Sequence, residues 1–280
     1  MAKAKKITAA DPAVSGKSGS LSKGLSILNL LADAPAPLAM TEITEALGLD
    51  NSTTYRLLQT LTEEGYVVRG AGSKQYVAGP RMLATLPTQH PLNSFRREIS
   101  SSLRRLRDEL GETVAGVLFI GRERIIVDVV QGRDFLSPYY TSWLKSPLHG
   151  SASGRLLLLS LSAEDRRQLI GEGPYEAVTS CTIIEPAQLA EELMQIRARG
   201  YTVVRDETLI GITAIAASIT LGNQALGCLA VTANSGRIDH LAADAIGRAL
   251  ANAAKLTSQG APSLRALAYA VGLKDTTQNQ

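Results

Sequence analysis

Apolar side chains recur at helical spacing near the start of the chain. Leu21, Leu25 and Leu28 stand four and three residues apart, which predicts a helix over residues 21–34. Pro35 follows directly and ends the pattern, because proline cannot continue a helix.

Two further helical segments follow at short intervals. Residues 41–47 predict a short helix with Thr41 as its candidate N-cap, and Gly48 ends it because glycine tolerates left-handed backbone. Asp50 or Asn51 then caps a helix that is expected to run to about residue 64.

A β-hairpin is expected directly after these helices. Residues 66–69 and 74–77 are rich in Val and Tyr, and the Gly-rich stretch 70–73 between them predicts a turn. Three helices followed by a hairpin form a winged helix-turn-helix, so residues 21–86 are interpreted as one domain.

The outward face of the third predicted helix is rich in hydrogen-bonding side chains. On a helical wheel, Thr54, Leu58 and neighbouring leucines fall on one side and hydroxyl, Arg and Gln side chains fall opposite. Such a face is often only solvated, but in this motif it is the face offered to the major groove of DNA. The candidate DNA-contacting residues are Ser52, Thr53, Tyr55, Arg56, Gln59, Arg69 and Lys74, of which the last two flank the wing turn.

A break at Pro87 and Pro91 precedes a longer amphipathic segment. Residues 94–110 place apolar side chains on one side and five arginines on the other, which predicts a helix. We interpret residues 87–112 as a linker helix between two domains.

From Glu112 onward the pattern alternates between strands and helices. The expected strands are 114–120, 124–130, 201–205, 212–219 and 226–232, and the expected helices are 151–160, 163–170, 186–199 and 239–257. This pattern predicts an α/β domain over 113–257, followed by a polar, weakly helical tail at 258–280. Turn residues interrupt the apolar stretch 209–231, so two strands and no membrane segment are expected there.

Charge and reactive residues narrow the classes of function. Residues 1–20 hold four lysines against one aspartate and no apolar signal segment, which predicts a flexible basic arm with phosphate contact as a further role. Two cysteines and three scattered histidines give no metal-ligand spacing, so no metal or cofactor is expected. GSASG has Ala152 where a hydrolase needs its nucleophile, so no catalytic residue is assigned.

The order of these motifs resembles one family of proteins. TEITEALGLDNSTTYRLLQTLTEEGYVVR and YVAGPRMLAT are similar to the N-terminal domain of IclR-family bacterial transcription regulators. GETVAGVLFIGRERIIVDVVQG, SPLHGSASGRLLL and GITAIAASI resemble the GAF-like effector domain of that family. The resemblance covers about residues 21–257 and implies an α+β fold with a winged helix-turn-helix, a linker helix and a GAF-like α/β effector-binding domain.

The resemblance also implies partners. It implies a cytoplasmic regulator that binds double-stranded operator DNA as a homodimer or a tetramer, a dimer of dimers, and that responds to a small organic effector. An enzyme built on the second domain and a protein-interaction scaffold are the alternatives. The scaffold would explain the long helix at 94–110 but not the winged helix.

The effector pocket is also assigned by resemblance. The positions that correspond to the family's pocket are Phe135, Pro138, Tyr140, Ser146, Ala152, Ser153, Val204, Ile212, Ala214, Ala230 and Thr232. Most of these are apolar or small, which favours a larger, less polar effector, aromatic or lactone-like. The aromatic rings near residue 140 either stack on the effector or pack in the core or at a subunit interface. The start of helix 151–160 offers unpaired N–H groups to a carboxylate, or Ser151 simply caps the helix.

Overall fold

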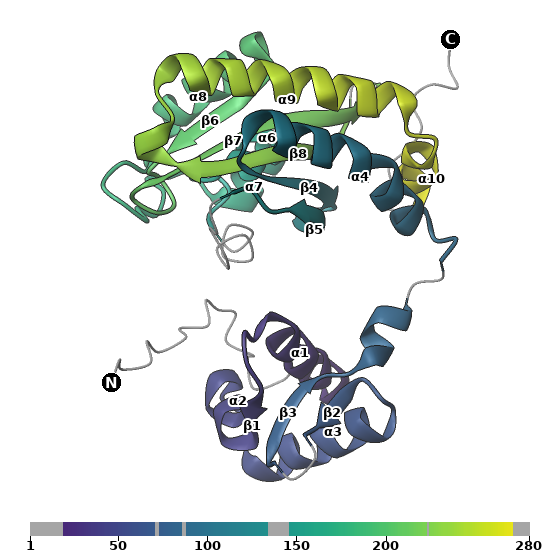
Figure 1. The fold of residues 1–280 in the computed structure, drawn as a ribbon. Coiled ribbons are helices and arrows are strands. Elements are labelled where there is room, and N and C mark those ends of the chain that lie inside the picture. The colour runs from purple at the N-terminus through teal and green to yellow at the C-terminus, as the bar shows by residue number, and fades with distance from the viewer. Residues whose placement is uncertain (1–18, 71–72, 86–87, 134–145, 223, 271–280) are drawn as a thin grey trace. The chain divides into compact units, whose positions relative to one another are not determined.

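A computed structural model describes residues 19–70, 73–85, 88–133, 146–222 and 224–270 (Figure 1). The chain divides into two compact units, Met1–Pro87 and Thr88–Gln280. No helix among the described residues is both long and apolar enough to cross a bilayer.

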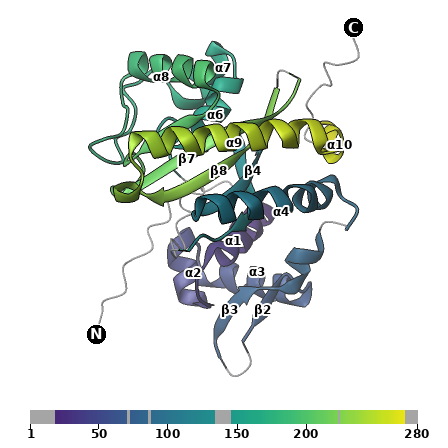
Figure 2. The same ribbon diagram turned by 45° about the horizontal axis from the view of Figure 1, so that its top comes forward.

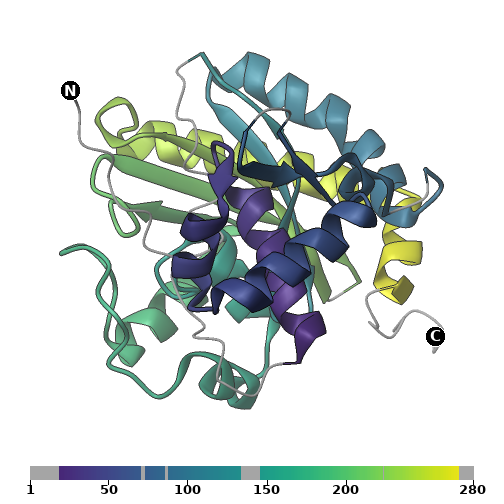
Figure 3. The ribbon, with the colours of Figure 1, turned by 90° about the horizontal axis from the view of Figure 1, so that it is seen from below.

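The first unit is a winged helix-turn-helix, as predicted (Figure 3). Its strands form an antiparallel sheet in the order β1-β3-β2, and its core includes Ile27, Ile43, Leu58 and Tyr76. The elements are α1 (Ser20–Asp33), β1 (Leu38–Ala39), α2 (Met40–Leu47), α3 (Asn51–Glu63), β2 (Val67–Arg69), β3 (Gln75–Ala78) and the short helix η1 (Pro80–Thr85).

The start of α2 differs from the prediction. Thr41 is not the N-cap, because the helix begins one residue earlier and Ala39 occupies that position. Strand β1 pairs with β3 as far as Ala39, so the helix starts as soon as the strand ends. The Glu42 carboxylate accepts a hydrogen bond from the Ala39 N–H at 2.6 Å and replaces the expected hydroxyl cap. At the other end, Gly48 is left-handed, with φ 61°, as expected.

The second unit is built around a five-stranded antiparallel sheet in the order β5-β4-β8-β7-β6 (Figure 2). One face packs against α4, α9 and α10, and the other face packs against α6 and α8. The elements are α4 (Pro91–Leu110), β4 (Thr113–Ile120), β5 (Glu123–Val130), α6 (Ala152–Ser160), α7 (Ala163–Ile170), α8 (Pro186–Arg199), β6 (Thr202–Arg205), β7 (Ile212–Leu221), β8 (Gln224–Asn234), η2 (Ser235–Arg237), α9 (His240–Gly260) and α10 (Ser263–Ala270).

Helix α4, which contains the predicted linker helix, also packs as part of the second unit. Phe95, Ile99 and Leu103 are fully buried in the core of this unit. Gly116 of β4 allows this close approach, because a Cβ at that position would lie 2.5 Å from the Cδ1 of Ile99. The amphipathic stripe therefore covers the sheet.

The chain after residue 257 also differs from the prediction. Helix α9 continues to Gly260, and α10 follows where a polar tail was expected. Leu264 and Leu267, three residues apart, are almost completely buried in the core against α4. The Ser263 hydroxyl donates to Glu98 of α4 at 2.6 Å, so this segment closes one end of the core.

Candidate DNA-contacting face and effector cleft

Helix α3 separates a buried face from an exposed face, as its pattern predicts. Thr54 and Leu58 are buried, at 0% and 1% exposure, against α1 and the wing sheet. Ser52, Tyr55, Arg56 and Gln59 are exposed on the other side, and Thr53 is half-buried. The structure therefore brings the five candidate residues of this helix onto one accessible surface, which we call the α3 face.

The N-terminus of α3 is fixed by Asp50, one of the two predicted caps. Its Oδ1 accepts hydrogen bonds from the Thr53 N–H at 2.8 Å and from the Ser52 hydroxyl at 2.7 Å. These bonds hold the pKa of Asp50 well below its usual range, with the Thr53 backbone as the largest cause. The carboxylate is therefore ionised at neutral pH and orients Ser52 at the edge of the α3 face.

The two long side chains of the α3 face differ in their contacts. Gln59 donates from Nε2 to the Glu63 carboxylate at 2.9 Å. The Arg56 guanidinium makes no hydrogen bond or ion pair with any described residue, and it is exposed. Arg56 is therefore available for a bidentate contact, whereas Gln59 must first leave Glu63.

The wing carries the two remaining candidate residues. Arg69 ends β2, and its guanidinium carbon lies 6.0 Å from the centre of the Tyr76 ring, within reach of a cation–π contact. Lys74 precedes β3 and is exposed. The two cations thus stand on either side of the wing turn.

A cleft in the second unit opens between the sheet and the start of α6. It brings together six of the predicted effector positions, Ala152, Ser153, Ile212, Ala214, Ala230 and Thr232. Its walls also include Ser151, which the start of helix 151–160 had already suggested, and Ala115, Val117, Ile126 and Thr208, which sequence reasoning did not assign. The free volume is only about 30 Å³, room for about two water molecules.

The other predicted effector positions lie elsewhere. Val204 is 1% exposed and packs in the core with α6 and α8, so it does not line the described cleft. Ser146 contributes its carbonyl oxygen to Arg124 next to the cleft. Phe135, Pro138 and Tyr140 lie outside the described residues.

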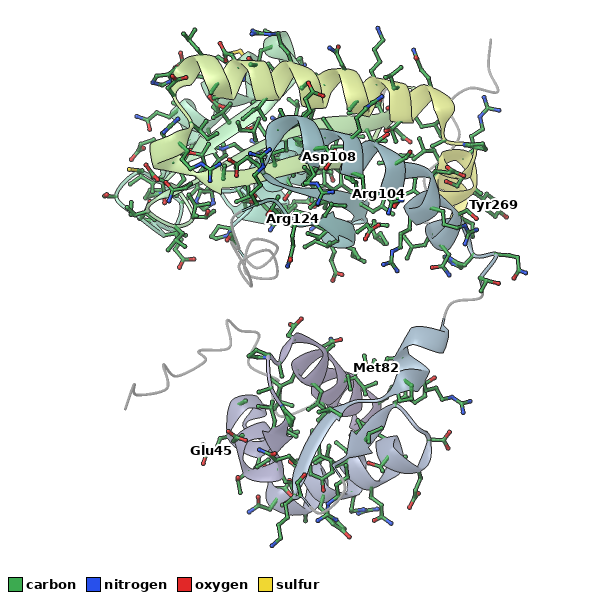
Figure 4. The ribbon with its side chains drawn as sticks, in the orientation of Figure 1. Glu45, Met82, Arg104, Asp108, Arg124 and Tyr269 are labelled. Atoms are coloured by element: carbon green, nitrogen blue, oxygen red, sulfur yellow. The ribbon has the colours of Figure 1, made fainter. Side chains whose placement is uncertain are left out.

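Arg124 of β5 organises the start of α6 (Figure 4). Its Nη1 donates to the hydroxyls of Ser151 at 2.6 Å and Ser153 at 3.2 Å, and its Nη2 donates to the Ser146 carbonyl at 2.7 Å. Burial lowers the pKa of this guanidinium to about 10, so it remains charged at neutral pH.

The contacts of Arg124 decide the role of Ser151. Ser151 occupies the N-cap position of α6, but its side chain makes no cap hydrogen bond. It accepts from Arg124 and donates to the Pro147 carbonyl at 3.1 Å instead. The simple cap is therefore wrong, and Ser151 presents a hydroxyl oriented by a buried cation to the cleft.

A second buried arginine, Arg155, connects α6 to the loop between β6 and β7. Its Nη2 lies 2.5 Å from Oε2 of Glu207, and its Nε donates to the His149 carbonyl at 2.7 Å. The Glu207 carboxylate also accepts from the Ile183 N–H at 3.0 Å. Glu207 precedes Thr208, so this ion pair joins two walls of the cleft.

The described residues around GSASG serve structural contacts. His149 is buried, and its Nε2 makes a hydrogen bond with the Glu176 carbonyl at 2.9 Å. The Oδ1 of Asp128 forms an ion pair with the Nη2 of Arg96 at 3.6 Å. Both residues therefore serve structural contacts, as the missing nucleophile at Ala152 suggested.

Fold and sites together define a class of protein, a DNA-binding transcription regulator with a separate sensing domain. The model of the IclR helix-turn-helix domain matches residues 20–71, and the model of the bacterial transcriptional regulator IclR C-terminal domain matches residues 93–259. The chain belongs to the IclR family of transcription regulators.

Individual relatives agree with this assignment. The transcriptional repressor IclR of Escherichia coli K12 is 32% identical over 73% of this chain and 75% of its own length. The acetate operon repressor of Salmonella typhimurium is 30% identical over 74% of this chain and 76% of its own. These relatives are repressors and not enzymes.

Solved structures share the fold. An IclR homolog from Microbacterium hydrocarbonoxydans, complexed with 4-hydroxybenzoate, has a TM-score of 0.74 at 19% identity and covers 89% of this chain and 100% of its own. The Thermotoga maritima IclR has a TM-score of 0.64 at 24% identity, with 86% and 97% covered.

Proposed function

We propose that this protein reads operator DNA with the α3 face and the wing, and that an organic effector bound in the cleft beside α6 changes its affinity for that DNA. One observation carries the DNA half of the proposal. An exposed Arg56 without a described partner stands opposite a buried stripe on the second helix of a helix-turn-helix, where base contacts are made.

The lining of the cleft supports an effector with an apolar body and one polar end. Most of the walls are alanine and branched aliphatic side chains, whereas Ser151, Ser153, Thr208 and Thr232 supply hydroxyls. Arg124 donates hydrogen bonds to two of these hydroxyls, those of Ser151 and Ser153, and so polarises them. An aromatic or lactone-like acid fits this chemistry, and the bound 4-hydroxybenzoate of the Microbacterium relative is of that kind.

The size of the cleft supplies a mechanism for the response. A volume of about 30 Å³ is too small for an aromatic acid, so the effector must select an arrangement in which the walls stand further apart. Arg155 joins α6, which forms one wall of the cleft, to the loop that leads into β7. Strand β7 belongs to the sheet whose other face packs against α4, so a movement of this wall can reach α4. A coupling of about 1–3 kcal/mol between the sites would give roughly 5–150-fold regulation.

The proposal extends to assembly, location and targets. The protein acts in the cytoplasm as a homodimer or a dimer of dimers, because paired recognition helices read half-sites about one helical turn, ~34–36 Å, or a multiple apart. A catabolic operon is the proposed target, and the acetate operon repressor among the relatives supports that class of target.

DNA binding is tested by replacing Arg56 with Ala. An operator is first selected from genomic fragments with the purified protein, and affinity is then measured by fluorescence anisotropy. Arg56→Ala is expected to weaken operator binding while effector binding stays unchanged. Arg167→Ala, an exposed arginine of α7, is the charge-matched control. An unchanged operator affinity in the Arg56 variant would contradict the proposed DNA face.

The effector is tested by thermal shift and calorimetry with 4-hydroxybenzoate, benzoate, glycolate and acetate. We expect the aromatic acids to raise the melting temperature. If only the short polar acids raised it, the proposed aromatic class of effector would be wrong. Reciprocity requires operator DNA to change effector affinity by the same factor as the effector changes operator affinity. Equal effector affinity with and without operator would rule out the coupling.

A further inference from the structure

A second and larger cleft lies in the same unit, at the opposite end of α6. The last turns of α6, α8 and α9 and the end of the β7–β8 hairpin form its walls. Its volume of about 840 Å³ lies within the ~300–1,000 Å³ typical of small-molecule sites. We call it the hairpin cleft.

The short strand β6 accounts for this cleft. Strand β6 begins at Thr202, which pairs with Ala216, so residues 217–221 of β7 continue without a neighbour on that side among the described strands. Helices α8 and α9 flank this edge from the two faces of the sheet (Figure 2). The Thr220 N–H already donates to the Ser258 hydroxyl at 2.9 Å. The edge therefore does not offer the free row of donors that an added strand would need.

Two cations stand on the walls of the hairpin cleft. Arg197 of α8 and Lys255 of α9 are exposed, and neither side chain makes an ion pair or hydrogen bond with any described residue. No Asp or Glu is among the residues that line the cleft. By contrast, the nearby Arg199 is held by Glu192 at 2.6 Å.

The helix dipole explains only one of these cations. Arg197 lies in the last turn of α8, where the partial negative charge of the carbonyl groups favours a cation. Lys255 precedes the end of α9 at Gly260 by more than a turn, where the dipole effect has faded. Lys255 is thus a positive charge without a partner among the described residues, and it stands beside an apolar wall that includes the partly exposed Leu159, Leu221 and Ala251.

We propose that the hairpin cleft is a second small-molecule site, for amphipathic carboxylates. The apolar body of the ligand packs on Leu159, Leu221 and Ala251, and its carboxylate pairs with Arg197 and Lys255. This site shares no lining residue with the cleft at the start of α6, and it does not depend on operator binding.

The test is a calorimetric titration of the full chain with octanoate. Octan-1-ol, which lacks the charge, and acetate, which lacks the apolar body, are the matched probes. Octanoate is expected to bind, and R197Q/K255Q is expected to weaken its binding about two- to thirtyfold, because the variant removes two exposed ion pairs that contribute roughly 0.2–1 kcal/mol each. The control R167Q/R265Q removes two exposed cations elsewhere in the same unit and should leave the affinity unchanged.

Two further variants fix the location. Ala251→Leu narrows the hairpin cleft and should weaken octanoate binding, whereas Ala214→Val narrows the cleft at the start of α6 and should not affect it. Unchanged octanoate affinity in R197Q/K255Q overturns the proposal, as does octan-1-ol binding equal to that of octanoate. Loss of octanoate binding in Ala214→Val alone would place octanoate in the other cleft and overturn it as well.

Discussion

The Nη2 of Arg155 lies 2.5 Å from Oε2 of Glu207, although the two residues are 52 positions apart in the chain. Both side chains are almost completely buried, at 1% and 8% exposure. Arg155 is part of α6, and Glu207 stands beside Asp206, which has a left-handed backbone and whose Oδ1 accepts hydrogen bonds from the Gly211 N–H and the Ser235 hydroxyl. The pair therefore fixes a tight loop against α6, the helix whose start lines the smaller cleft.

Breaking this pair is expected to destabilise the second unit strongly. Arg155→Met leaves Glu207 buried and without its partner charge, which typically costs about 3–5 kcal/mol. Arg155→Met/Glu207→Leu removes both charges and should recover most of this loss. Guanidinium unfolding, with hydrogen exchange on peptides of residues 152–160 and 202–221, measures the effect.

The control for this pair is Arg167→Ala, an exposed arginine of α7, for which a change within about 0.5 kcal/mol is expected. Equal stability of the Arg155 variant and wild type would mean that the pair does not hold the loop. A double variant as unstable as the single one would show that the lost hydrogen bonds to the His149 carbonyl and from the Ile183 N–H, and not the unpaired charge, are the main contribution.

Some of this architecture could be predicted from local signals alone. Helix α8 has the predicted bounds because Pro186 stands at its first position and Gly200 directly after its end. The α3 face followed from the spacing of Thr54 and Leu58, and Asp50 was a visible cap. These features depend on neighbours within a turn or two, so the sequence contains them directly.

Long-range contacts could not be predicted in this way. Arg124 reaches serines that lie 27 and 29 positions further on, and no periodicity in the chain marks that meeting. The burial of α10 depends on α4, which is more than 150 residues earlier. Leu264 and Leu267 were a weak signal for it, because two apolar residues three apart occur by chance in many polar tails.

Arg56 and Lys74 should affect DNA binding in different ways. Arg56→Ala removes a side chain able to bind a base edge, so it should cost about 1–3 kcal/mol and relax the preference at one operator position. Lys74 is expected to contact backbone phosphate, so Lys74→Ala should weaken binding to all sequences evenly and reduce the salt dependence by about one released ion. Anisotropy titrations at several salt concentrations on selected and shuffled sites separate the two.

Those titrations also test the assignment of the wing. A Lys74 variant that changes base preference but not the salt slope would place this residue at a base edge. A Lys74 variant that binds every site as wild type does would remove the wing from the interface. The Arg69 side chain is held near Tyr76, so Arg69→Lys serves as a comparison that keeps the charge and loses the stacked geometry.

Asp50 should make the stability of α3 depend on acid pH. Its pKa is lowered in the folded chain, so its stabilising effect is fully present above the ordinary aspartate value of about 3.9 and is lost as the pH falls below that value. Asp50→Asn retains a good N-cap without the titrating charge, so its stability should depend less on acid pH. Asp50→Ala should be less stable at every pH.

Hydrogen exchange of the peptide covering residues 51–63, measured between neutral and acid pH, reports this effect locally. The Asn variant is the decisive comparison, because it separates the hydrogen bond from the charge. An Asn variant with the same acid dependence as wild type would assign that dependence to other carboxylates.

Gly247 and Gly260 give a matched pair of substitutions in α9. A Cβ at Gly247 would lie 2.3 Å from the Tyr201 ring, whereas a Cβ at Gly260 would meet nothing within 4 Å. Gly247→Ala should therefore destabilise the second unit by about 1–3 kcal/mol through overpacking. Gly260→Ala should stay within about 0.5 kcal/mol of wild type.

A double-mutant cycle identifies the cause of the Gly247 effect. The Tyr201 ring is held by its hydroxyl, which donates to Asp244 at 2.8 Å, so the ring cannot simply turn away from a new methyl group. Tyr201→Ala empties that space, and adding Gly247→Ala to it should cost nothing further, because the clash is gone. Urea unfolding of the four proteins measures the coupling, and a Gly247→Ala cost that persists without the ring would assign the loss to the α9 backbone.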